Sequence, residues 1–253
     1  MRAQHTQLLS PRRQRGYSLI ELSITVLIAL FLLGGLLVVV QDNKRTFGNQ
    51  TALAQLQDNE RLAMSMMTDI IQSAGYFPDP TANTAVSAFP QVAPFTSFAG
   101  QAIVGTGALA AGAPGDTVTV RFRTNSNDTI INCAGLSNKS GAPQTYVNAF
   151  AVVNGQLVCT MNGTTYPLIG SPTLQVYKLQ VEYGVNRGGG AANNVDTYVD
   201  AANMAAADWQ RLISVKITLW FVNPLYNATQ TGQAQYLSFM RVIDVMSVGG
   251  VST

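Results

Sequence analysis

The sequence predicts an α+β protein in which one long N-terminal helix packs on an antiparallel β-sheet. Three observations support this fold class. The segment 17–40 is apolar, 41–75 continues it as an amphipathic stretch without proline, and short runs with period-two alternation fill much of 76–253. A helix and a sheet that each have one apolar face can bury those faces against each other. The segment 76–253 is therefore predicted to be one β-rich domain.

The apolar segment carries a single carboxylate. Tyr17–Val40 has 24 residues, and Glu21 is its only side chain of ordinary charge. Because about 20 apolar residues in a helix span a bilayer, this segment is predicted to be a transmembrane helix. A carboxylate in hydrocarbon is costly unless it is paired, so Glu21 is predicted to have a functional partner.

The leader before this segment, Met1–Gly16, is basic and contains no acid. Its charged residues are Arg2, Arg12, Arg13 and Arg15. A secretory signal would be cleaved after its apolar run, whereas here the plausible cut lies before it, on the cytoplasmic edge. Arginines before the span and the bulk of the chain after it place residues beyond about 41 outside the cytoplasm.

The motif Gly16-Tyr17-Ser18-Leu19-Ile20-Glu21 resembles the class III signal of type IV prepilins and type II secretion pseudopilins. The resemblance implies that prepilin peptidase cuts after Gly16 and that Tyr17 becomes the N-methylated first residue. Glu21 would then pair with the α-amino group of Tyr17 on a neighbouring subunit, which would set axial register during assembly. The alternative is an ordinary signal anchor in which the glycine and the glutamate occur by chance.

Further patches resemble the PilW-type minor pilins. They are Asn59-Glu60-Arg61, Ile70–Tyr76, Gly115–Phe122, Val181–Asn186, Trp209 and the run 212–219. The resemblance implies a pilin-like fold and a low-abundance structural subunit in the priming or tip complex of a type IV pilus, with twitching, adhesion or DNA uptake downstream. It implies contacts with prepilin peptidase, with other minor and major pilins and with the inner membrane, and a tip adhesin is a further candidate partner.

The same resemblance implies a location. The chain would be a single-pass protein of the bacterial inner membrane with its C-terminal domain in the periplasm, and would then move to the pilus at the cell surface. Two alternatives stay open. One is a GspJ-like minor pseudopilin of a type II secretion system. The other is a membrane-anchored adhesin or ligand-binding domain that uses the signal only for insertion.

The helix is predicted to run from about 18 to 73. Its second half has one apolar face, made by Leu53, Leu56, Ala63, Met67, Ile70 and Ala74. Gly75 ends the helix, and Pro78 prevents its resumption. The next segment, 76–115, is expected to be a long loop fixed by aromatic residues. These residues are Phe77, Phe89, Phe95 and Phe98.

Six runs are predicted to be strands. They are 116–123, 146–153, 156–162, 174–185, 212–223 and 236–248. Asn154-Gly155 between two of them is a strong hairpin signal. The last run is predicted to pair antiparallel with 212–223.

Charge argues against nucleic-acid binding. Four of the 15 basic residues lie in the leader, so the chain after Gly16 would carry 11 basic and 13 acidic residues. Phosphate binding relies on clustered Lys and Arg, and the small clusters here, such as Arg121 with Arg123, are interpreted as solvated faces.

The chain has two cysteines, Cys133 and Cys159, and both follow the apolar segment. Outside the cytoplasm a disulfide can form and persist. A Cys133–Cys159 bridge is favoured because neither residue has another cysteine as a partner, and two buried free thiols are the alternative.

The sequence does not predict an enzyme, a cofactor or a metal site. The only histidine, His5, lies in the leader, and there is neither a CxxC motif nor a phosphate-binding glycine loop. Paired-carboxylate hydrolysis remains open, although acids are few. The turn at 186–196 has too few carboxylates for calcium, with only Asp196 and Asp200 nearby, and is interpreted as a flexible surface loop.

Overall fold

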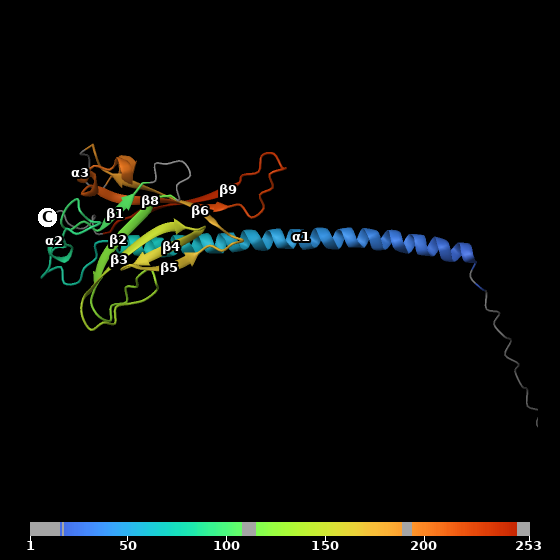
Figure 1. Cartoon of the computed structure of the whole chain (residues 1–253), viewed down its shortest axis with the longest axis horizontal. Helices are drawn as coiled ribbons and strands as arrows, with labels where there is room; N and C mark the ends of the chain where they lie inside the picture. Colours follow the sequence, from blue (N-terminus) through green and yellow to red (C-terminus); the bar gives the residue numbers. More distant parts are fainter. Residues whose placement is uncertain (1–15, 17, 108–114, 189–193, 247–253) are drawn as a thin grey trace, which may run out of the picture. The chain divides into compact units, whose positions relative to one another are not determined.

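The computed structural model describes residues 16, 18–107, 115–188 and 194–246. The chain falls into two compact units that divide between Gln50 and Thr51. One helix, α1 (Leu19–Gln72), runs through 54 residues and contributes to both units (Figure 1). Its bounds agree with the predicted helix to within one residue at each end.

In the N-terminal unit, hydroxyl side chains of the helix donate hydrogen bonds to carbonyl groups of the same helix. The hydroxyls of Ser23 and Thr25 donate to the carbonyl oxygens of Ile20 and Leu22, each at 2.8 Å. An α-helix pairs its backbone groups internally, which is the requirement for crossing hydrocarbon. This segment therefore presents no unpaired hydroxyl donor from either residue to a membrane.

In the C-terminal unit, the helix buries one face. Its buried residues are Leu56, Ala63, Met64, Met67, Ile70 and Ile71. Five of the six predicted face positions are buried, namely all except Leu53, which is half-buried. The opposite face is exposed at Asp58, Arg61 and Asp69, as the 3.6-residue period predicts.

The strands form two antiparallel sheets rather than the one expected. The first has the order β1 (Ile103–Thr106), β2 (Thr117–Thr124), β3 (Gln144–Val153), β4 (Gln156–Met161), β5 (Thr164–Ile169). The second has the order β7 (Thr197–Asp200), β6 (Val176–Val185), β8 (Leu212–Val222), β9 (Tyr236–Asp244). The short helices are α2 (Ala85–Ala88), a 3₁₀ turn (Ala201–Asn203) and α3 (Ala206–Trp209). The α+β class, with a long N-terminal helix and antiparallel β-sheets, is confirmed.

All six predicted strands are present, and β9 pairs antiparallel with β8 as expected. The final strand ends at Asp244 rather than 248, and positions 247 and 248 lie outside the described residues. Three short strands were not predicted. They are β1, β5 and β7, of which β1 and β7 have four residues each.

Two Asn-Gly turns organise the first sheet. Asn154 and Gly155 both have positive φ, 51° and 76°, and connect β3 to β4, as the hairpin signal predicts. Asn162 and Gly163 have positive φ values of 47° and 89° and connect β4 to β5. The sequence therefore also contains a hairpin signal for the turn between β4 and β5.

One core joins the helix to both sheets. Its largest fully buried side chains include Tyr183, Phe122, Phe150, Phe221, Met64, Met67, Ile71, Leu157 and Leu179. These residues come from α1, from β2, β3 and β4 of the first sheet, and from β6 and β8 of the second. The C-terminal unit thus has its own continuous core.

The first strand explains why the loop at 76–115 was misjudged in part. Gly105 lies in β1 where the hydroxyl of Tyr183 approaches, so that any Cβ at this position would overlap the phenol. A glycine in a strand commonly marks such a close approach, but it also removes the alternation that would have revealed the strand. The expectation that aromatic residues fix the loop is confirmed, because Phe89 and Phe95 are fully buried.

Candidate functional site

The predicted cleavage position lies before the helix. Gly16 is exposed and non-helical, and a Cβ placed on it would meet no atom within 4 Å. Tyr17 lies outside the described residues. The open surroundings of Gly16 suit a residue that must enter a peptidase, and the cut itself stays a prediction.

Glu21 lies in the first turn of α1 and is exposed. Among the described residues it forms no ion pair. A carboxylate in the first turn is favoured by the helix dipole, yet this interaction does not offset the cost of placing a charge in hydrocarbon. A partner for Glu21 would therefore have to come from another molecule or from the undescribed N-terminal segment.

The N-terminal part of α1 exposes an unusual amount of apolar surface. Every side chain from Leu19 to Gln50 is exposed, and Leu19 and Phe31 are more than four-fifths accessible. The helix is long and apolar enough to cross a membrane. A contiguous apolar surface of this size requires lipid or other helices to cover it.

The structure contains the predicted disulfide. Cys133 and Cys159 are bonded with their Cα atoms 6.3 Å apart, and both are buried. Cys133 lies in the loop between β2 and β3, whereas Cys159 lies in β4. The backbone N–H of Cys133 donates to the side-chain oxygen of Asn148 at 3.1 Å. A bridge of this span stabilises a domain by about 3 kcal/mol in the chain-entropy model.

Arg121 is buried, and the interpretation of this residue as part of a solvated face is wrong. Its Nε donates to the carbonyl of Gln101 at 2.6 Å, and its terminal nitrogens donate to the carbonyls of Pro90 and Phe89 at 2.9 and 3.2 Å. Burial lowers the pKa of the guanidinium to about 10. The side chain thus remains charged at neutral pH and holds the loop against β2.

The aromatic rings of the same loop complete this site. The guanidinium carbon of Arg121 lies 4.3 Å from the ring centre of Phe95 and 5.2 Å from that of Phe89, distances typical of cation–π contacts. Alternation in β2 correctly puts Arg121 on the opposite face from Val120 and Phe122. That face is covered by a loop whose position the sequence does not reveal.

A second polar site holds the segment between β6 and β8. The Arg187 guanidinium donates to both oxygens of Asp208, at 3.1 and 2.6 Å. These bonds lower the pKa of the Asp208 carboxyl below its ordinary value. The side chain of Asp196 accepts from the backbone N–H groups of Arg187 and Gly188, which lowers its pKa as well.

This arrangement modifies the interpretation of 186–196 as a flexible loop. Residues 189–193 lie outside the described residues. The carboxylate of Asp196, which follows them, bonds to the backbone of Arg187 and Gly188, which precede them. This carboxylate thus has a local structural role. Among the described residues, no group of three or more His, Cys, Asp or Glu side chains is arranged to hold a metal ion.

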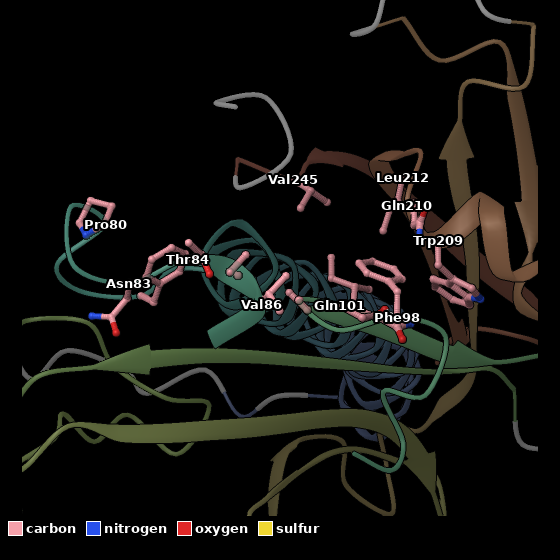
Figure 2. Close-up of a pocket in the computed structure, with 16 residues that line it drawn as sticks. Pro80, Asn83, Thr84, Val86, Phe98, Gln101, Trp209, Gln210, Leu212 and Val245 are labelled. Carbon is pink, nitrogen blue, oxygen red and sulfur yellow. Dashed lines mark hydrogen bonds between the residues drawn. The ribbon is translucent and has the colours of Figure 1, made fainter. Parts of the chain in front are cut away.

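Two hollows lie beside the end of α1 in the C-terminal unit. One has a volume of about 540 Å³, and Figure 2 shows Phe98, Trp209, Leu212 and Val245 around it. Its polar lining residues are Asn83, Thr84, Gln101 and Gln210. This lining contains no acid or base, so the hollow offers binding surface without the groups that proton transfer requires.

The second hollow, of about 710 Å³, shares Gly75, Phe77 and Pro80 with the first. It adds two carboxylates, Asp69 and Asp79, which lie on its lining without a basic partner in the described part of the chain. The arrangement resembles a surface groove more than a closed catalytic pocket.

Comparison with protein families gives two matches. Residues 145–247 match the family described as Type IV Pilus-assembly protein W. Residues 11–37 match the prokaryotic N-terminal methylation motif, and this range contains Gly16, Tyr17 and Glu21. The first range contains β4 to β9 and all of β3 except Gln144.

Comparison with solved structures gives matches that include the following two chains. A type IV-like pilin from Thermus thermophilus is 15% identical, covers 77% of this chain and 97% of its own length, and has a TM-score of 0.44. The GspK-GspI-GspJ complex of the type 2 secretion system from enterotoxigenic Escherichia coli includes a chain that is 13% identical, with 75% and 97% coverage and a TM-score of 0.37. No curated protein matches the chain.

Proposed function

We propose that this chain, a type IV pilin-like protein of the PilW group, acts as a minor pilin in the priming or tip complex of a type IV pilus. The observation that carries the proposal is the prepilin-like N-terminus followed by a helix that begins with a mainly apolar segment, exposed throughout. An apolar helix of this kind can lie in a membrane before assembly and among other pilin helices afterwards. The same surface thus serves both states.

Processing would begin at the inner membrane. Prepilin peptidase would cut between Gly16 and Tyr17, and the domain that follows α1 would lie in the periplasm, where the disulfide is chemically stable. Removal of the leader takes away four arginines. These charges would otherwise oppose the extraction of the helix from the cytoplasmic face of the membrane.

Glu21 would then direct docking. Cleavage would create a new α-amino group on Tyr17, and a neighbouring subunit would bring that group to the carboxylate of Glu21. An opposite charge in a dry environment is a strong and position-specific partner, because any other register leaves two charges unpaired. The pair would fix how far one helix slides along the next.

The proposal is tested first by mass spectrometry of sheared surface filaments and of the membrane fraction. We expect the filaments to contain a chain that begins at N-methylated Tyr17. A processed chain confined to membranes would favour a pseudopilin, and a processed chain that enters no filament but binds a surface or glycan would favour an adhesin. A chain that retains Met1–Gly16 would contradict processing altogether.

The role of Glu21 is tested separately. Glu21→Ala and the nearly isosteric Glu21→Gln should leave cleavage intact and reduce incorporation into filaments at least tenfold, since breaking a buried pair costs roughly 3–5 kcal/mol. Ser23→Ala is the matched control, because Ser23 bonds only within its own helix. Normal incorporation of both Glu21 variants would remove the pairing from the proposal.

A further inference from the structure

One edge of the second sheet is long and open. The strand order is β7-β6-β8-β9, so β9 has a neighbour on one side only. It pairs with β8 over nine residues, from Tyr236 to Asp244, without a register shift. A nine-residue strand is about 30 Å long, which is enough to accept a full partner strand.

Two hydrogen bonds at the ends of β9 determine which residues face the open side. The N–H of Asn223 donates to the carbonyl oxygen of Gln235, and the N–H of Val245 donates to that of Ile213, each at 2.9 Å. In an antiparallel ladder, bonded and non-bonded residues alternate. Odd-numbered residues of β9 therefore bond to β8, and even-numbered residues direct their N–H and C=O groups outward.

The outward-directed backbone belongs to Tyr236, Ser238, Met240, Val242 and Asp244. Within the part of the chain that the structure describes, none of these five backbone units has a hydrogen-bond partner on the open side. Unpaired strand edges of this length are a template for pairing with another chain.

The other three sheet edges are protected. Strands β1 and β7 have only four residues each. Strand β5 contains Pro167, and its pairing with β4 is irregular at Leu157 and Val158. Short edges, proline and bulges are the usual means by which proteins prevent edge-to-edge pairing. The strand β9 contains neither proline nor glycine.

The side chains along this edge are mostly apolar. Met240 is 65% exposed and Val242 is 46% exposed. On the adjacent strand, by contrast, Lys216 faces Val242 and forms an ion pair with Glu182 at 2.8 Å. At this register position the sheet therefore changes from a charged side chain on β8 to an exposed apolar one on β9.

The two ends of this edge differ in charge. Among the five outward-facing residues only Asp244 is charged, and it lies at the C-terminal end of the strand. The nearby Arg241 is on the other face, where its guanidinium approaches the hydroxyl of Thr68 at 3.4 Å. A complementary strand would carry apolar side chains beside Met240 and Val242 and a Lys or Arg beside Asp244.

We propose that β9 is a docking strand to which an extended segment of a different pilin subunit adds as a fifth strand of this sheet. The main-chain bonds supply affinity, and the side chains beside Met240, Val242 and Asp244 supply selectivity. The inference rests on the proposed function, since the partner is another subunit of the same assembly.

The size of the contact favours a partner anchored in the same membrane. A single added strand buries less than the surface typical of a stable complex between free proteins. When both chains are held by membrane helices, the second contact becomes effectively intramolecular, and weak pairing is sufficient. A free soluble protein would lack this advantage.

The test uses Met240→Pro in the full chain, expressed in cells that lack the native copy. Proline removes the outward N–H of residue 240 and keeps the bonds to β8, which involve its odd-numbered neighbours. Met240→Ala is the control, because it shortens the side chain and keeps the N–H. We expect about tenfold less partner pilin to copurify with the proline variant than with the alanine variant. Equal recovery would overturn the proposal.

A cross-linking experiment tests the same contact without relying on the proline variant. Both native cysteines are in the disulfide, so Ser238→Cys introduces one free thiol on the β9 edge for a photo-reactive probe. Thr164→Cys on the β5 edge is the matched control. Adducts to another pilin from position 238 alone support the proposal, whereas equal adducts from both positions, no adducts, or adducts to a second copy of this chain overturn it.

Failure of this inference differs from failure of the proposed function. If the unmodified chain never enters filaments, the minor-pilin function is wrong. If it enters filaments and the variants at 238 and 240 give the overturning results, only the docking role of β9 is wrong.

Discussion

The two units of the chain treat apolar residues in opposite ways. In the N-terminal unit, Leu30 is 60% exposed and Phe31 is 83% exposed. In the C-terminal unit, Met64 and Met67 of the same helix are fully buried. One helix therefore contains a segment that folds against its own chain and another that requires a different environment. The contrast indicates that the first segment requires lipid or other protein to cover its apolar side chains.

The two segments also differ in what supports their structure. The exposed segment relies on internal backbone bonds and on hydroxyls that bond to their own helix. The buried segment contributes to a core that includes residues from both sheets. Substitutions in the two segments should therefore change different measurements, and the following predictions use that separation.

The largest effect is expected at Gly16. Gly16→Leu should block cleavage, because the peptidase must accept the residue before the cut, and should abolish incorporation into filaments. The unfolding midpoint of the C-terminal unit should not change, since Gly16 contacts nothing within 4 Å of a Cβ position. Immunoblotting measures processing, and thermal unfolding in detergent measures stability. A processed variant would contradict the predicted cleavage position.

The second prediction compares the replacement of a large apolar side chain by alanine in each of the two segments. Met67→Ala should lower the free energy of unfolding by about 2–5 kcal/mol, because it leaves a cavity in the core. Leu30→Ala should change it by less than about 0.5 kcal/mol. Both tryptophans, Trp209 and Trp220, lie in the C-terminal unit, so fluorescence during urea unfolding of the full chain in detergent reports on that unit. Similar losses in both variants would contradict the separation.

The smallest effect concerns pH. Asp208→Asn should cost about 1–2 kcal/mol at pH 7, because it weakens two charged hydrogen bonds to Arg187, whose side chain is partly exposed. The folded pKa of Asp208 lies below its unfolded value. Its stabilisation is therefore present above the unfolded pKa and is lost as pH falls through the folded pKa.

The pH prediction is checked by urea unfolding at a series of pH values. The difference between the native chain and Asp208→Asn should shrink as the pH decreases below about 4. Asp58→Asn is the control, since Asp58 is exposed on α1. A difference that stays constant on acidification would show that the carboxylate charge is not what stabilises the segment.

Much of the architecture could be predicted because its signals are local. The period of α1, the alternation in β8 and the Asn154-Gly155 turn each depend on residues close together in the chain. The strands that were missed are those with weak local signals: β1 contains Gly105, β5 contains Pro167, and β7 has four residues.

The polar sites, by contrast, could not be predicted from the sequence. Arg121 was interpreted as solvated because it belongs to a small cluster of charges. Only the folded loop shows that carbonyl groups and two phenylalanines cover its side chain. Arg187 and Asp208 are 21 residues apart. No local pattern connects them, so their ion pair could not be predicted.

The sequence by itself determined the features that depend on neighbouring residues or on composition. These are the prepilin-like motif, the long helix, the six main strands and the cysteine pair. Only the tertiary structure decided that the strands divide into two sheets, that Arg121 holds a loop, and that β9 lies at an open edge. The reason is physical: which strand is at an edge and which face is covered depend on contacts between distant segments, and these are set by packing of the whole domain.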